Sequence, residues 1–136
     1  MKTHFSEVMV KTNNREELID ITRYVEDSVH GSKVEQGICL VYLPHSTASL
    51  VVNENEEGLI QDIFSSIQSL IPKETKWVHN RIDNNAQAHL ASVILTSSRT
   101  FPIRDGTILR GRWQNIFLLE LDGPRSRKIV IQILGE

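Results

Sequence analysis

The chain has 136 residues, 40% of them hydrophobic, which predicts a single domain spanning 1–136 with a core of its own. Its 15 lysines and arginines nearly balance its 17 aspartates and glutamates, and a net charge of −2 argues against binding to nucleic acid or to an anionic membrane. Charges interrupt the first twenty residues and no apolar run is long enough to cross a bilayer, so we expect a cytoplasmic protein with neither a signal peptide nor a membrane span.

The N-terminal part of the chain predicts a strand followed by a helix. Residues 4–11 alternate between apolar and polar side chains, as in a strand with one buried face. Asn13 and Glu16 have the spacing of a capping box, so we expect a helix to begin there. Its apolar stripe consists of Leu18, Ile21, Val25 and Val29. His30 and Gly31 suit the C-terminal end of this helix, because the dipole favours a cation there and glycine tolerates a left-handed cap.

The middle of the chain predicts two strands and a long helix. Residues 37–43 form an apolar run typical of a central strand, and we expect Cys39, the only cysteine, to be buried in it. A second strand is predicted over 49–52. After residue 54, apolar side chains recur at intervals of three and four up to Pro72, which predicts an amphipathic helix that ends at the proline.

The C-terminal half predicts a loop, a short helix and several short strands. The segment 77–85 is rich in hydrogen-bonding side chains, so we expect a surface loop, and Asn85 is a natural N-cap for a helix after it. The strands are expected at 101–103, 107–109, 116–121 and 128–134. Strands in consecutive pairs beside two long helices favour an α+β fold with antiparallel pairing. The chain has no glycine-rich phosphate loop and no helix with the His-Glu pattern of zinc proteases.

Polar side chains gather in the segment 44–55, between two runs that we expect to be buried. They are His45, Ser46, Thr47, Ser49, Asn53, Glu54 and Asn55. Burying such groups without partners is costly, so polar groups in such a position usually serve hydrogen bonding or chemistry. This segment is therefore the leading candidate for a functional site.

Three histidines, His45, His79 and His89, each lie beside a polar cluster near the edge of a predicted element. Together with Glu54 they suit a site for zinc or another divalent ion, with water completing the shell. The same histidines suit proton transfer near neutral pH, or anion binding in the imidazolium form. Their spacings of 34 and 10 residues match no compact metal motif, so these alternatives stay open.

The hydroxyls of Ser46 and Thr47 suggest hydrogen bonding more than nucleophilic attack. A nucleophile and its base seldom lie side by side on a strand, because neighbouring side chains point to opposite faces. We therefore expect these hydroxyls to bind a phosphate or the backbone.

Two further pairs of residues are candidates for ligand binding. Arg125 and Arg127 follow a glycine-proline turn and suit either a bidentate phosphate clamp or solvated turn charges. Trp113 and Gln114 provide a flat apolar ring beside an amide, which suits stacking on a heteroaromatic ligand or packing at a subunit contact.

Five motifs in this order resemble the YjbQ family over nearly the whole chain. They are HSTASL with NEN (45–55), His79-Asn80, NAQAHL (85–90), GRWQNI (111–116) and ELDGPRSR (120–127). The resemblance implies a compact α+β fold with an antiparallel β-sandwich and two main helices, assembled as a homotrimer. It also implies a secondary thiamine-phosphate synthase activity, which joins a pyrimidine diphosphate to a thiazole phosphate and releases pyrophosphate.

The resemblance assigns residues to that activity. The family histidines correspond to His45, His79 and His89, which together with Glu54 we expect to be catalytic or to bind a divalent metal such as magnesium or zinc. We expect the substrate to be held by Ser46, Thr47, Asn53, Asn80, Trp113, Gln114, Arg125 and Arg127. The partners implied are a small phosphorylated metabolite and two further copies of the chain.

The chain departs from the family pattern at Gln87, Ala91, Thr96 and Arg112. Family members often have a histidine, a basic residue, a glycine and a threonine there, and loss of a cation near the histidines would weaken phosphate binding. Two alternatives to a synthase remain. One is a trimeric metal- or anion-binding protein without catalytic activity, and the other is a hydrolase of another phosphorylated metabolite.

Overall fold

The structure, a computed structural model, describes residues 1–136 and contains eight strands, three α-helices and one short 3₁₀ helix. In chain order these are β1 (Lys2–Lys11), β2 (Glu17–Asp20), α1 (Thr22–Ser32), β3 (Gln36–Tyr42), β4 (Ala48–Asn53), α2 (Glu57–Leu70), η1 (Val78–Arg81), α3 (Ala86–Leu95), β5 (Ser98–Arg104), β6 (Thr107–Ile108), β7 (Asn115–Glu120) and β8 (Ser126–Gly135). None of the helices is both long and apolar enough to span a membrane.

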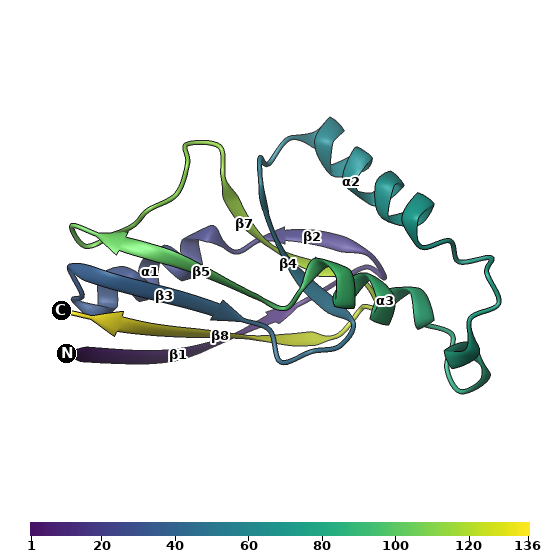
Figure 1. Ribbon diagram of the computed structural model, residues 1–136, viewed down its shortest axis with the longest axis horizontal. Coiled ribbons are helices and arrows are strands. Elements are labelled where there is room, and N and C mark those ends of the chain that lie inside the picture. The colour runs from purple at the N-terminus through teal and green to yellow at the C-terminus, as the bar shows by residue number, and fades with distance from the viewer.

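The strands form two sheets in which every pair is antiparallel. One sheet has five strands in the order β1-β8-β3-β5-β6, and the other has three in the order β2-β7-β4. Figure 1 shows the long strands of the first sheet running together, with the chain termini at one end and α3 toward the other. The predicted α+β fold with antiparallel pairing is therefore confirmed.

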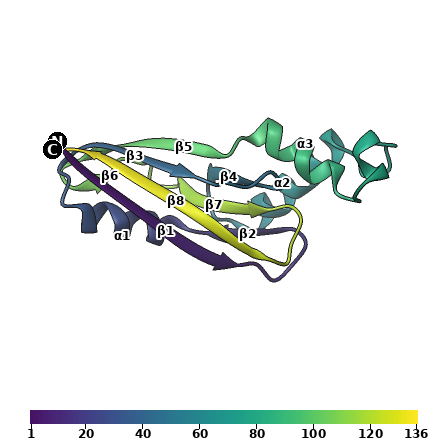
Figure 2. The same cartoon turned by 90° about the horizontal axis from the view of Figure 1, so that it is seen from below.

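One hydrophobic core joins both sheets to α1. Buried side chains of β3, β5 and β8 alternate with exposed or half-buried ones. They meet the buried stripe of α1 and the buried residues of β4 and β7. Figure 2 shows α1 lying along one face of the five-stranded sheet. The core's largest fully buried side chains are Ile21, Leu43, Leu50, Ile116, Leu118, Ile129, Ile131 and Ile133. The thiol of Cys39 is free and buried within this core, as expected, and burial raises its pKa to about 12.

The first helix begins later than the sequence pattern predicts. Residues 17–20 form β2 instead, where Leu18 pairs with Leu119 of β7, and α1 begins only at Thr22. The carboxylate of Asp20 accepts a hydrogen bond from the Thr22 amide at 3.0 Å, so it serves the helix start that we assigned to Asn13. The helix also runs through Gly31 and ends at Ser32, with Lys33 in the left-handed conformation at φ 62°. Strand pairing with a distant segment has overridden the local helical pattern.

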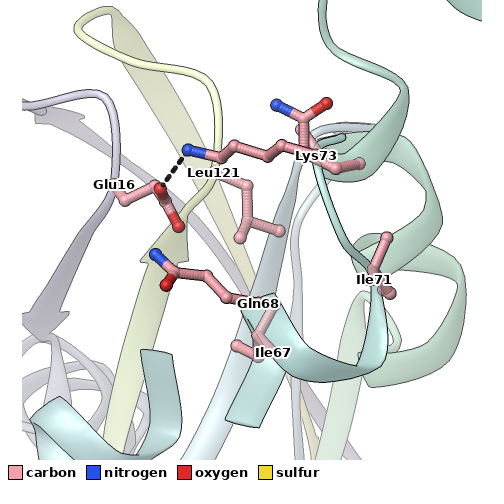
Figure 3. A pocket seen from close by; sticks show the side chains of 8 residues that line it. Glu16, Ile67, Gln68, Ile71, Lys73 and Leu121 are labelled. Atoms are coloured by element: carbon pink, nitrogen blue, oxygen red, sulfur yellow. Dashed lines mark hydrogen bonds and ion pairs between the residues drawn. The ribbon is translucent and has the colours of Figure 1, made fainter. Parts of the chain in front are cut away.

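The second helix, α2, forms where the sequence predicts it and packs loosely. The Glu56 side chain caps it by accepting hydrogen bonds from the amides of Gly58 and Leu59. None of its residues is fully buried, and Phe64 and Ile67 pack against a small second cluster around Leu121. Just beyond α2, Lys73 pairs with Glu16 at 3.0 Å, as Figure 3 shows. The crevice beneath this pair holds about 10 Å³, about enough for one water, so it is no ligand site.

The third helix, α3, brings three distant segments together. Ser92 donates a hydrogen bond to the Ala48 carbonyl at the start of β4, at 2.8 Å. Ser49 donates to the carbonyl of Thr96, just beyond the end of α3. The amide of Leu43, beyond β3, donates to the Ser97 carbonyl at 2.8 Å. The corner between β3 and β4, the C-terminal half of α3 and the start of β5 therefore meet at one place.

Candidate functional site

The corner between β3 and β4 borders an open hollow of about 440 Å³. Two histidines and several hydroxyls line it, and only one lining residue is hydrophobic. The lining consists of His45, Ser46, His89, Ser92, Val93, Thr96, Ser97 and Ser98. The predicted residues His45, Ser46 and His89 therefore share one hollow, although they come from segments more than forty residues apart.

A backbone hydrogen bond fixes the ring of His45. Its Nε2 accepts the amide N–H of Lys128 in β8 at 2.8 Å. The ring is half-buried, and burial lowers the pKa of His45 below its usual range. The positive charge of Arg127 lowers this pKa further, and the carboxylate of Glu120 opposes that effect in part. The Lys128 amide also favours the neutral ring, because a protonated Nε2 has no lone pair with which to accept its hydrogen bond.

The other two histidines lie against each other beside the same hollow. The rings of His79 and His89 meet edge to face, with centroids 4.6 Å apart. Nε2 of His79 lies 3.0 Å from Oδ1 of Asn85. The amide group of Asn85 donates in turn to the Asp122 carboxylate at 2.8 Å. Asn85 occupies the predicted N-cap position of α3, but its side chain orients His79 rather than capping the helix.

Asn80 and Arg125 lie near this network without lining the hollow. Oδ1 of Asn80 accepts the amide N–H of Ala86 at 3.1 Å, which supports the first turn of α3. The exposed guanidinium of Arg125 pairs with Asp122 at 3.1 Å, at the turn between β7 and β8. Arg125 therefore retains the solvent exposure that a phosphate clamp requires.

Arg127 and Thr47 are buried and hydrogen-bonded to other protein groups, so neither faces a ligand. The side chain of Arg127 is 2% exposed and that of its partner Glu120 is fully buried. The guanidinium donates twice to Glu120 through Nε, at 2.9 and 3.1 Å, and through its terminal nitrogen to both oxygens of Thr47. Arg127 thus holds the corner that carries His45, and its Nε and Nη2 are already bonded to Glu120 and Thr47.

Glu120 is held as a carboxylate by its hydrogen bonds. Burial alone would raise the pKa of Glu120, but donors from Arg127, from the Asp122 amide and from Thr12 outweigh it and lower this pKa. Thr12 donates at 2.8 Å and the amide of Leu121 at 3.0 Å. Both oxygens of the Glu120 carboxylate therefore accept hydrogen bonds inside the protein, which is what makes such a buried charge tolerable there.

Thr96, which lines the hollow, occupies a strained backbone conformation. It has φ 71° and ψ 166°, a region used almost entirely by glycine. Its hydroxyl accepts a hydrogen bond from Arg99, which also donates to the Leu95 carbonyl at 3.1 Å. Arg99 is thus a cation beside the hollow, and strain of this kind is typical of functional sites.

The remaining predicted residues lie at the other end of β4. Asn53 pairs with Asn115 of β7, which is adjacent to Trp113 and Gln114, whereas the start of β4 pairs with Glu120. About 17 Å of extended strand separates these two ends. The exposed ring of Trp113 is covered on one side by the guanidinium of Arg112, at 5.2 Å, and the side chain of Asn53 accepts the Glu54 amide. Within one chain, therefore, Asn53, Glu54, Trp113 and Gln114 do not join the histidines.

The three histidines do not suit a metal site within one chain. No group of three or more histidine, cysteine, aspartate or glutamate side chains is arranged to hold an ion. Nε2 of His45 already accepts a hydrogen bond, so the neutral ring carries its proton on Nδ1 and offers a metal no lone pair. Nδ1 of His79 and the ring of His89 are the nitrogens that stay available.

Comparison with known proteins identifies the family. The model of the family described as "UPF0047 protein YjbQ-like" matches residues 6–136. This chain belongs to the YjbQ family. A UPF0047 protein of Methanothermobacter thermautotrophicus is 41% identical over 136 residues, covering 100% of this chain and 95% of the relative. One from Methanocaldococcus jannaschii is 42% identical over 128 residues, covering 93% and 91%.

Crystal structures of two similar archaeal proteins share this fold. A protein of Sulfolobus solfataricus, described as YbjQ-like and of unknown function, has a TM-score of 0.97 and 48% identity over 99% of both chains. A hypothetical protein of Aeropyrum pernix has a TM-score of 0.93 and 39% identity over the full length of both. These likenesses show the fold and the family, and the reaction has to be argued from the site.

Several residues of this YjbQ-family site were missed by reasoning from the sequence. They are Asn85 and Asp122, which orient His79, and Ser92, Thr96, Ser97, Ser98 and Arg99, which line or border the hollow. The run of three hydroxyl residues at 96–98, directly after an apolar helix, was an available signal. The contribution of Asp122 had no such signal, because it depends on a turn that only the folded chain brings beside α3.

Proposed function

We propose that this protein is an enzyme acting on a small phosphorylated metabolite, with a thiamine-phosphate synthase reaction as a secondary activity. One observation carries the proposal: His45 and His89 share an open hollow of about 440 Å³ with five hydroxyl side chains and the neighbouring cation of Arg99. Hydroxyls, imidazole N–H groups and arginine are the groups that bind phosphate oxygens in proteins. The absence of a glycine-rich phosphate loop means that these side chains would do the binding.

In the proposed reaction, the pyrimidine diphosphate loses pyrophosphate as its carbon forms a bond to the thiazole phosphate. Negative charge then develops on the leaving pyrophosphate oxygens. Donors fixed before the reaction stabilise such charge without reorganising. The hydroxyls of Ser97, just before β5, and Ser98, at its start, suit that role.

We propose further that the sheets act as the two halves of a β-sandwich in a homotrimer. The outer face of the five-stranded sheet supports this, since Phe5, Met9, Ile38 and Tyr42 are 57%, 60%, 48% and 41% exposed there. Exposed apolar groups gathered on one face are typical of a protein interface. Assembly would also offer a way for residues at the far end of β4 to reach the histidines of another copy. Light scattering should give three times 15.5 kDa for the wild type and a smaller mass for Ile38→Glu.

The synthase proposal is tested by incubating the purified protein with pyrimidine diphosphate and thiazole phosphate. We expect thiamine phosphate and pyrophosphate in equal amounts from the wild type and at least a tenfold lower rate from His89→Ala. His4→Ala is the matched control, because His4 lies in β1 beside Ile133, away from the hollow. Inorganic phosphate in place of pyrophosphate would indicate a hydrolase, and tight substrate binding without any product would indicate a binding protein. Either result contradicts the synthase.

A further inference from the structure

The hydrogen bond from Lys128 determines which nitrogen of the neutral His45 ring carries the proton. The amide of Lys128 has a hydrogen to donate and nothing to accept with, so Nε2 of His45 must supply the lone pair. The single proton of the neutral ring is then on Nδ1. A ring turned over about its Cβ–Cγ bond would present a carbon to the amide, so the backbone fixes both the tautomer and the orientation.

Nδ1 of His45 is open to a ligand. It makes no hydrogen bond within the chain. Every buried side-chain nitrogen or oxygen has a hydrogen-bond partner, so this atom without a partner is not buried. The atom is therefore accessible, on a ring that lines the hollow. The result is an N–H donor held in the corner between β3 and β4 and aimed away from its backbone anchor in β8.

We propose that His45 serves this site as a permanently neutral hydrogen-bond donor, which holds an acceptor oxygen of the ligand's phosphate through Nδ1–H and neither ligates metal nor takes up a proton. This inference rests on the proposed function and specifies how the phosphate is held. The surroundings support a neutral ring: burial, Arg127 and Arg125 all favour it, and Glu120 alone among the nearby charges opposes it. The contrast with His79 is sharp. Asn85 accepts from Nε2 of His79, so the neutral ring there carries its proton on Nε2 and leaves its lone pair on Nδ1.

Replacing His45 with glutamine or asparagine separates the role of Nε2, which accepts the Lys128 amide, from the role of Nδ1, which donates to the ligand. Gln at position 45 has a carbonyl that reaches the place of Nε2 and accepts the Lys128 amide, but it has nothing at Nδ1. Asn places an NH₂ near Nδ1 and leaves the Lys128 amide without its acceptor. We expect His45→Gln to retain wild-type stability while weakening inorganic pyrophosphate binding roughly 10- to 100-fold, the usual effect of one hydrogen bond to a charged group. We expect His45→Asn to unfold more easily but to bind pyrophosphate within about threefold of the wild type.

Nitrogen-15 NMR of the imidazole rings reads the tautomer directly, without any ligand. We expect the proton of His45 on Nδ1 at pH 7.5 and no second proton at pH 6, and we expect zinc to leave both nitrogens unchanged. A proton on Nε2, a doubly protonated ring at pH 6, or stoichiometric zinc bound through His45 would overturn the inference. So would pyrophosphate binding that His45→Gln leaves intact. If the wild type binds no pyrophosphate at all, the proposed function fails, and the ring spectrum still decides the tautomer.

Discussion

The buried pair between Glu120 and Arg127 determines whether the corner that carries His45 is held in place. Replacing Glu120 with glutamine keeps the shape of the side chain but leaves the guanidinium of Arg127 charged and without a counter-ion in the interior. Removing one partner of a buried pair costs about 3–5 kcal/mol. Since a domain of this size has a total free energy of unfolding of about 5–15 kcal/mol, the loss is a large fraction of it. The melting temperature should fall by roughly 10–15 °C.

Urea denaturation at pH 7, followed by circular dichroism, measures this cost. The matched control is Arg125→Gln, which removes a cation only two residues away. The Arg125 side chain is 49% exposed in its pair with Asp122, so we expect a change of at most about 1 kcal/mol.

A double variant separates the buried charge from the lost contacts. Glu120→Gln combined with Arg127→Met removes both charges, and we expect it to be at least about 1 kcal/mol more stable than Glu120→Gln alone. The reasoning is refuted if Glu120→Gln is as mild as Arg125→Gln, or if the double variant is less stable than the single one.

Two further predictions concern the hollow. Because the pKa of His45 is lowered in the folded protein, the stability contribution of its neutral ring is complete above the unfolded value of 6.5 and is lost as the pH falls below it toward the lowered pKa. Between pH 7.5 and 5.5 the urea midpoint of the wild type should therefore drop more than that of His45→Gln, and equal drops would contradict the shift. Thr96→Gly should relieve backbone strain and raise the free energy of unfolding by about 1 kcal/mol, after allowance for the flexibility of glycine. Thr100→Gly, on an ordinary strand position of β5, should lower it, and a loss of stability in both variants would mean that Thr96 is not strained.

Local sequence patterns predicted most of the fold because most helices and strands form where the pattern of their own residues favours them. The apolar run at 37–43 forms a strand and the helical spacing up to Pro72 forms a helix, both as expected. The predicted start of α1 was wrong because Leu18 and Ile21 fit a helix as well as a strand over so short a span. The choice was made by pairing with β7, more than ninety residues away, which no local pattern contains.

The candidate site was less predictable than the fold, for a related reason. The sequence pointed to His45 and His89, but the register between β4 and β7 decided which other candidates could reach them. The burial of Arg127 could have been found, because it has the same parity along β8 as Ile129, Ile131 and Ile133, which all point inward. Its nearness to a turn gave the opposite and incorrect impression of exposure.

The most direct test of the account is a pyrophosphate titration of the ¹⁵N-labelled protein, followed through the backbone amide signals. We predict saturable shifts confined to the residues around the hollow, at His45 and Ser46 and across 92–98, with little change in α2. Shifts that instead gather at α2, or that are absent at His45 and Ser98 while binding saturates, would contradict the claim that this hollow binds a phosphorylated ligand.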